Sequence, residues 1–281
     1  MLPILPAVAG TSQIPAQGSR EYAQVLPAIV SYMERELKLP LVEGVVIVYP
    51  SQASYEAGVV AESENDIERL RAQLGPAGDQ IRIEDVTLAA RRMAVSSIAI
   101  GMYRKILVND WRARNHSWSD WVRVLAHELT HTAERELVGG RITLADQWIR
   151  EGFSDWVGYK VVEGFGGEKF VRGREYALKL ISDSRAYQTF PSLSQLGRSA
   201  EWTTWVRNRG HAATYGQAFI AVDFLIEQKG LPAVTDYFRR SGAVNNRERN
   251  FAAAFGEPFP LFEKKFESQL QILLHKTESV M

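Results

Sequence analysis

The chain of 281 residues contains no cysteine. This absence excludes disulfide bonds, thiolate metal ligands and cysteine nucleophiles, so any metal site must use histidine, aspartate or glutamate side chains. It does not fix the compartment, because exported and cytosolic proteins can both lack cysteine.

The sequence also lacks an excess of either charge and any long apolar run. Lys+Arg and Asp+Glu each total 33, so no overall field would attract nucleic acid or an anionic membrane surface. No stretch of about 18 consecutive apolar residues is present, and no membrane span is therefore expected. Hydrophobic residues make up 46% and charged residues 23% of the chain, which is typical of a globular domain with a sizeable core.

The N-terminal residues 1–18 are rich in proline, glycine, serine and glutamine and predict a flexible tail. Within them, Ala7-Val8-Ala9 resembles the small-residue cleavage site of a secretory signal, but no basic segment precedes it. The segment fits either a tail or the remnant of a signal peptide. Localisation therefore stays open between the cytoplasm and export.

The next hundred residues predict helices and strands in mixed order. Apolar residues recur at helical spacing over 19–39 before Pro40 ends the pattern. The β-branched run at 44–49 predicts a buried strand. Further along the chain, the patterns predict helix within 51–74, a loop at 75–78 and strands at 81–83 and 98–108, and they leave 84–97 unassigned.

From Ser117 onward, helical patterns dominate and are separated mainly by glycines. This order of elements predicts an α+β fold in a single domain over 19–281. Residues 19–138 would form a small mixed-sheet N-terminal lobe, and residues 139–281 a mainly helical C-terminal lobe.

The most informative segment is His127-Glu128-Leu129-Thr130-His131, an H-E-x-x-H motif inside a helical pattern that ends at Gly139-Gly140. Residues four apart lie on one helix face, so both imidazoles can reach one metal ion. Glu128 points about 100° around the helix from His127, which places it beside a bound water rather than on the metal.

A second helical segment, beginning near Trp148, carries two acidic residues one turn apart. Glu151, 20 residues beyond His131, would complete a three-ligand site with an open position for water, as a catalytic zinc requires. Asp155 can accept the ring N–H of a ligating histidine and fix its orientation. Gly152 removes a side chain where two helices must approach closely around the metal. The sequence therefore predicts one Zn²⁺ per chain.

The pair HELTH and EGFSD resembles the gluzincin metallopeptidases, the clan that includes thermolysin and the zinc aminopeptidases. This resemblance implies a thermolysin-like zincin fold, an active-site cleft between the two lobes, and hydrolysis of peptide or protein substrates. It implies that His127, His131 and Glu151 bind zinc, that Glu128 is the general base, and that Asp155 is the partner of His127.

Two later stretches extend the resemblance over roughly residues 20–275. A helix is predicted from Tyr215 to Gln228, and the resemblance implies that Tyr215 stabilises the oxyanion. His211, one turn earlier, is the alternative donor. The structural alternatives are a packed aromatic for Tyr215 and, for His211, a loop position or a position at the N-terminus of the helix. The stretch 251–270 resembles the closing helices of the clan.

One stretch departs from the aminopeptidase pattern. Those enzymes carry Gly-x-Met-Glu-Asn on an edge strand before the zinc motif, and its glutamate binds the free amine of the substrate. Here Gly101-Met102 is followed by Tyr103 in place of that acid, which favours an endopeptidase or a peptidase of narrow specificity. Gly101 and Met102 remain candidate substrate contacts, because an edge strand can pair with an extended peptide.

Two other functions fit the same residues. A zinc hydrolase of a non-peptide amide would need the same ligands and the same base. A catalytically inactive, peptidase-like binding protein would keep the fold, but the intact Glu128 and ligand set favour an enzyme. The sequence does not indicate an oligomeric state.

Overall fold

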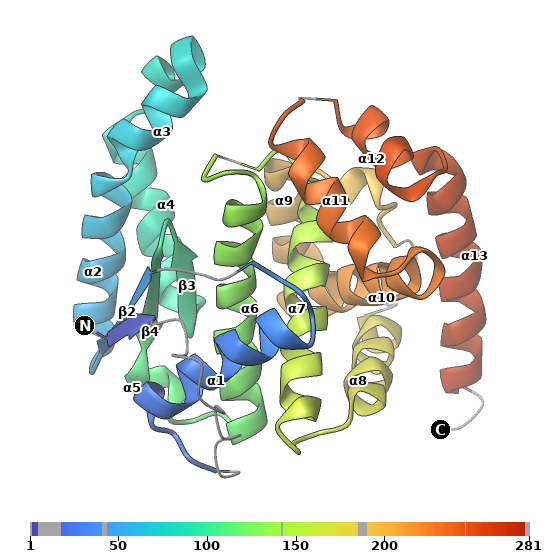
Figure 1. The fold of residues 1–281 in the computed structure, drawn as a ribbon, viewed down its shortest axis with the longest axis horizontal. Coiled ribbons are helices and arrows are strands. Elements are labelled where there is room, and N and C mark those ends of the chain that lie inside the picture. Colours follow the sequence, from blue (N-terminus) through green and yellow to red (C-terminus); the bar gives the residue numbers. More distant parts are fainter. Residues whose placement is uncertain are drawn as a thin grey trace. The chain divides into compact units, whose positions relative to one another are not determined.

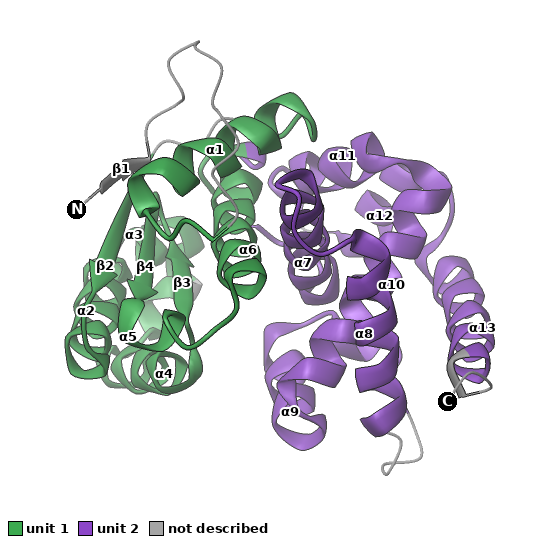
Figure 2. Cartoon of the chain, turned by 90° about the horizontal axis from the view of Figure 1, so that it is seen from below, with its two compact units in different colours: residues 1–136, 140–142 green, residues 137–139, 143–281 purple. Residues whose placement is uncertain are grey.

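The structure is a computed structural model, and it describes residues 2–4, 18–40, 44–141, 143–184, 190–244 and 246–278. It is mainly helical with a small mixed sheet (Figure 1), in agreement with the expected α+β class. The chain divides into two compact units, which Figure 2 colours separately. Unit 1 contains residues 1–136 and 140–142, and unit 2 contains residues 137–139 and 143–281.

Unit 1 contains the sheet, whose strand order is β1-β2-β4-β3. The strands are β1 (Leu2–Ile4), β2 (Gly44–Tyr49), β3 (Ala99–Met102) and β4 (Lys105–Asn109). Strands β2 and β4 are parallel, with Val46 opposite Ile106, whereas β1 pairs with β2 and β3 pairs with β4 in antiparallel fashion. Strand β3 therefore forms one edge of a mixed sheet.

The strand predictions are confirmed only in part. Strand β2 has the predicted bounds, but only Val46 on it is buried, so it is less buried than expected. The single strand predicted over 98–108 is a hairpin whose turn contains Arg104 with a φ of 53°. Its sequence has no glycine or proline at the turn, so the apolar run concealed the reversal.

One further strand prediction in unit 1 is wrong. The strand expected at 81–83 does not form, since Ile83 begins a helix. Strand β1 lies inside the segment predicted to be a flexible tail, because three residues gain backbone partners on β2. Residues 5–17 lie outside the described part of the chain, and with them the candidate cleavage site Ala7-Val8-Ala9.

Along the chain, the helices of unit 1 lie between the strands and after the last of them. They are α1 (Tyr22–Arg35), α2 (Gln52–Asn65), α3 (Ile67–Leu74), α4 (Ile83–Ser96), α5 (Asp110–Ala113) and α6 (Trp118–Leu137), with a 3-10 turn at Gly75–Gln80 where a loop was predicted. Helix α1 continues through Pro27, because its apolar face, which includes Val25 and Ile29, is buried and offsets the lost backbone hydrogen bond.

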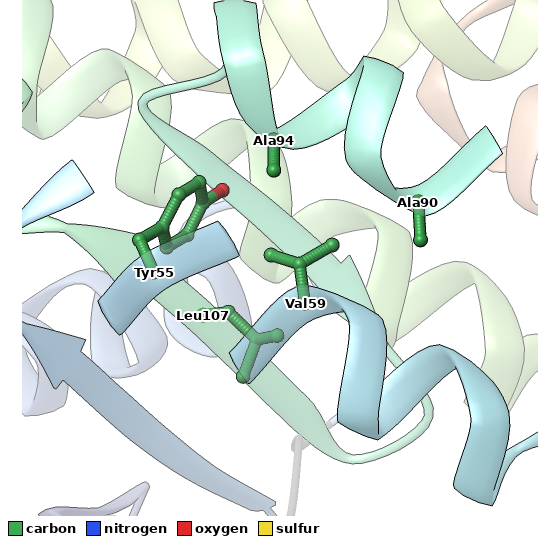
Figure 3. Packing of buried hydrophobic residues seen from close by; sticks show 5 residues of the cluster. All are labelled: Tyr55, Val59, Ala90, Ala94 and Leu107. Atoms are coloured by element: carbon green, nitrogen blue, oxygen red, sulfur yellow. The ribbon is translucent and has the colours of Figure 1, made fainter. Parts of the chain in front are cut away.

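A core cluster of unit 1 joins α2, α4 and β4 (Figure 3). Its five side chains are fully buried: Tyr55 and Val59 of α2, Ala90 and Ala94 of α4, and Leu107 of β4. The two alanines lie one turn apart on one face of α4, so their small side chains let α4 approach its neighbours closely. Burial of this face explains why the segment 84–97, which the patterns left unassigned, is helical up to Ser96.

Helix α6 carries the H-E-x-x-H motif, as predicted. At its start, the hydroxyl of Ser117 accepts the backbone N–H of Asp120 at 3.1 Å, which satisfies one of the unpaired donors of the first turn. The helix ends at Leu137, and Gly139 and Gly140 follow with φ of 67° and 75°. These left-handed conformations suit glycine and end the helix where the sequence indicated.

Unit 2 is helical in its described residues, as the patterns predicted. Its helices are α7 (Gln147–Gly164), α8 (Phe170–Asp183), α9 (Ser199–Arg209), α10 (His211–Lys229), α11 (Leu231–Ser241), α12 (Arg247–Phe255) and α13 (Phe259–Glu278), with a 3-10 turn at Ser194–Leu196. No helix in the described part of the chain is long and apolar enough to cross a membrane.

Helices α7 and α10 of unit 2 pack backbone against backbone. A Cβ atom on Gly152 of α7 would lie 2.2 Å from the carbonyl oxygen of Ala218 on α10, so no larger residue fits there without a shift. A close helix approach does occur at Gly152, but it is to α10 rather than to the other helix of the predicted metal site.

Candidate metal centre

Helix α6 brings two imidazoles together one turn apart. The Nε2 atoms of His127 and His131 are 3.1 Å apart, and their ring planes meet at 84°. Two nitrogen ligands on one tetrahedral zinc, each about 2.0–2.1 Å from the ion, lie about 3.3 Å from each other. The two rings thus already converge at nearly the separation that such an ion requires.

The third predicted ligand belongs to α7. One ligand atom from each of His127, His131 and Glu151 lies within 4.8 Å of the other two, so this group can hold a metal ion. Glu151 is 6% exposed, and its Oε1 accepts a hydrogen bond of 2.7 Å from Nε2 of Gln147. Gln147 was not singled out in the sequence, although it precedes Glu151 by one helical turn. Two imidazoles and a carboxylate form a donor set that suits zinc and related transition metals.

Glu128 is oriented by the edge of the sheet. Its Oε2 accepts the backbone N–H of Gly101 in β3 at 2.5 Å. The N–H of Gly101, a candidate substrate contact in the sequence, is therefore engaged by Glu128. A Cβ on Gly101 would lie 3.0 Å from that carboxylate oxygen and 3.1 Å from the carbonyl oxygen of Glu128, so the approach of β3 to α6 favours glycine at this position.

The other strand candidate, Met102, has a structural role in unit 1. Its side chain is partly buried and packs against the core cluster of Figure 3. The sequence suggested a substrate contact here because Met102 follows Gly101 on an edge strand, and strand alternation directs the two residues to opposite faces.

Glu134 is a residue of this centre that sequence reasoning missed. Its Oε2 lies 3.3 Å from Nδ1 of His131, and its side chain is fully buried. The signal was present in the sequence, because residues three apart on a helix lie on the same face.

Asp155 lies one turn beyond Glu151 on α7, and both carboxylates are buried. The next residue, Trp156, donates its ring N–H to Asp223 of α10 at 3.2 Å. Burial raises the pKa of the Asp223 carboxyl above its ordinary value, and the positive charge of Arg174 opposes this increase. This bond joins α7 to α10 directly beside Asp155, whose role as the partner of His127 remains a prediction.

Tyr215 and His211 lie together on α10. The helix begins at His211, four residues earlier than the predicted start at Tyr215, so His211 has the helix N-terminal position named as its structural alternative. The two rings stack with centroids 3.8 Å apart, and Trp202 of α9 contacts Tyr215 edge-on at 5.0 Å. The phenol ring is thus packed among aromatic neighbours.

Tyr103, in the hairpin turn after β3, lies among cationic side chains. The guanidinium carbon of Arg69 is 4.4 Å from the centre of its ring. Those of Arg104 and Arg135 are 5.6 and 5.8 Å away. Tyr103 therefore lies among guanidinium groups, two of which are paired with carboxylates, Arg69 with Asp66 and Arg104 with Glu136.

Comparisons of the chain with protein-family models, with curated proteins and with solved structures found no match. The functional assignment therefore rests on the residue pattern and on the geometry described above.

Proposed function

We propose that the protein is a zinc-dependent metallopeptidase of the gluzincin type, with a thermolysin-like zincin fold, which hydrolyses peptide bonds. One observation carries the proposal: the Nε2 atoms of His127 and His131 converge to 3.1 Å, and a carboxylate oxygen of Glu151 lies within reach of both. Two histidines and a glutamate form a ligand set of catalytic zinc sites, in which the fourth position accepts water or substrate.

Zinc bound by these residues supplies Lewis-acid chemistry, since it polarises a carbonyl oxygen and acidifies a water molecule. Glu128 takes a proton from the attacking water as the water oxygen bonds to the scissile carbonyl carbon. When the C–N bond breaks, Glu128 returns that proton to the leaving amine. The hydrogen bond from Gly101 supports this role, because it fixes the carboxylate orientation before substrate binds.

Tyr215 is proposed to donate a hydrogen bond to the negative charge that develops on the carbonyl oxygen. His211, which stacks on its ring, is the alternative donor. A Tyr215→Phe variant distinguishes the two proposals, because it removes the phenol hydroxyl and keeps the ring stack. A large loss of turnover would support Tyr215, and unchanged turnover would favour His211.

The surroundings of Tyr103 favour an endopeptidase or a peptidase of narrow specificity over an aminopeptidase. A free amino terminus is positively charged at neutral pH, and three guanidinium groups lie within 6 Å of the Tyr103 ring centre. Two of these groups are paired with carboxylates, Arg69 with Asp66 and Arg104 with Glu136, so the support comes from the absence of an acidic side chain at position 103. The edge of β3 is proposed to pair with an extended peptide substrate through backbone groups other than the Gly101 N–H, which Glu128 already accepts.

The first test is the metal content of protein purified without added metal. About one zinc per chain is expected, followed by cleavage of a peptide library. Glu128→Gln should retain zinc and lose about 10²- to 10⁴-fold in turnover. Glu136→Gln on the same helix is the matched control, because Glu136 contacts Arg104 on the surface, and it should retain both zinc and activity.

The other outcomes decide between the alternatives. A protein that takes up no zinc on reconstitution would overturn the proposal. If the protein binds about one zinc per chain and hydrolyses small amides but not peptides, it is the non-peptide amide hydrolase. Full zinc with no hydrolysis of either class would establish the inactive, peptidase-like binding protein.

A further inference from the structure

Glu134 is a fully buried carboxylate on α6, three residues after a proposed zinc ligand. Its Oε2 lies 3.3 Å from Nδ1 of His131. Burial of a carboxylate without compensation is costly, so a charged glutamate at this depth requires hydrogen-bond donors. Nδ1 of His131, at 3.3 Å, is in position to be one such donor.

The chemistry of the two groups sets the direction of this hydrogen bond. An ionised carboxylate can only accept, so Nδ1 of His131 carries the proton. In a neutral imidazole, the other nitrogen then has the lone pair. That nitrogen is Nε2, the atom that lies 3.1 Å from Nε2 of His127. The contact with Glu134 therefore presents the metal-binding lone pair of His131 toward its partner histidine.

All of these groups belong to unit 1. Glu134 and His131 share α6, and the helical spacing of three residues keeps them on one face. The contact between His131 and Glu134 therefore lies within a single helix and does not involve Glu151 of α7. This separates the role of Glu134 from the role proposed for Asp155, which lies on α7 beside Glu151.

We infer that Glu134 is a positioning residue that fixes the Nδ1–H tautomer and the ring orientation of His131, and so prepares Nε2 to bind the metal. Partners of this kind raise the basicity of a ligating imidazole, and their loss typically weakens metal binding by about 10- to 100-fold. The inference rests on the proposed metal function, and its test includes a measurement on metal-free protein.

The first measurement is the ring ¹⁵N spectrum of histidine-labelled, metal-free protein. In the wild type, His131 should show a protonated Nδ1 and an unprotonated Nε2. Glu151→Ala should leave this pattern unchanged, because it removes a ligand of α7 only. Glu134→Gln should yield a mixture of tautomers, since a neutral amide can accept or donate. The Glu134→Met variant introduces a side chain of similar volume to glutamate that has no strong hydrogen-bond acceptor. It replaces Glu134→Gln in this measurement if the glutamine variant does not fold.

The second measurement is zinc affinity by competition with a chelator. Glu134→Gln should bind zinc about 10- to 100-fold more weakly than the wild type. The control Glu136→Gln should stay within about twofold, since Glu136 lies two residues further on the same helix and contacts Arg104. If Glu134 has a purely structural role, its variants should have a lower melting temperature, while the tautomer of His131 and the zinc affinity stay unchanged.

The outcomes separate this inference from the proposed function. If the wild type binds zinc and the Glu134 variants keep both the tautomer and the affinity, the positioning role is wrong and the metallopeptidase proposal stands. A wild type with Nε2 protonated in His131 would also overturn the positioning role. If the wild type takes up no zinc, the proposed function fails whatever the tautomer.

Discussion

The backbone N–H of Gly101 donates a hydrogen bond of 2.5 Å to Oε2 of Glu128, across a sequence separation of 27 residues. Hydrogen bonds to an ionised acceptor are short and roughly twice as strong as neutral ones. Because β3 is the edge strand of the sheet, this N–H is directed to the helix rather than to a neighbouring strand. The edge strand β3 thus contributes to the orientation of the Glu128 carboxylate, the proposed general base.

Gly101→Ala should therefore impair turnover while zinc binding persists. The added Cβ would lie 3.0 Å from Oε2 and 3.1 Å from the carbonyl oxygen of Glu128, which forces β3 or the carboxylate to move. The required shift is a few tenths of an ångström, so the loss in rate should be smaller than the roughly 100-fold that a misplacement of about 1 Å can cost. The measurements are kcat on a cleaved peptide and zinc content. Wild-type turnover in the alanine variant would show that the contact does not orient Glu128.

Gly152→Ala should destabilise the packing of α7 against α10. The new Cβ would lie 2.2 Å from the carbonyl oxygen of Ala218, and overpacking of this kind typically costs about 1–3 kcal/mol in the free energy of unfolding. Gly216→Ala on α10 is the matched control, because its nearest atom, the carbonyl oxygen of Ala177, lies 3.3 Å away. Urea unfolding of both variants measures the difference, and an equal cost would refute the close approach.

Leu107→Ala should destabilise unit 1 through its core cluster. Leu107 is fully buried in the group shown in Figure 3, and truncation of a buried leucine typically costs about 2–5 kcal/mol. Leu88→Ala on α4 removes the same atoms from a side chain that is 49% exposed, so its cost should be small. Chemical denaturation of the two variants gives both values. Similar losses would mean that the cluster does not stabilise the unit.

Glu257 should make the stability of unit 2 depend on pH. Burial opposes its ionisation, but Lys265 and Lys229, at 2.6 and 2.9 Å, hold the pKa of the Glu257 carboxyl below its ordinary value of 4.5. Since the pKa is lower in the folded than in the unfolded chain, this stabilisation is present above pH 4.5 and is lost as the pH falls through the folded-state pKa.

Glu257→Gln should therefore lower the free energy of unfolding at pH 7, by about 1–3 kcal/mol, and the deficit should shrink as the pH falls below 4.5. Unfolding curves of the wild type and the variant at a series of pH values test this. Glu248→Gln, at an exposed position on α12, is the control and should show little change at any pH. A deficit for Glu257→Gln that stays constant with pH would exclude the charge of Glu257 as its cause.

Several features of the fold could be predicted because their signals are local. Strand β2 has a dense β-branched run, and α6 has periodic apolar residues that end at two glycines. Helix α4 could not be assigned, because the residues it buries include Ala90 and Ala94, whose small side chains produce a weak periodic pattern. The hairpin of β3 and β4 was missed because its turn has no glycine or proline and uses Arg104 in a left-handed conformation.

The sequence by itself determined the relationships that lie within one helix. The period of the α-helix places His127 beside His131 and Asp155 one turn after Glu151, and it would equally have placed Glu134 beside His131. Only the tertiary structure decided the contact of Gly101 with Glu128 and the packing of Gly152 against Ala218. Such contacts join residues far apart in the chain, and they depend on how separate elements bury their surfaces, which no local pattern encodes.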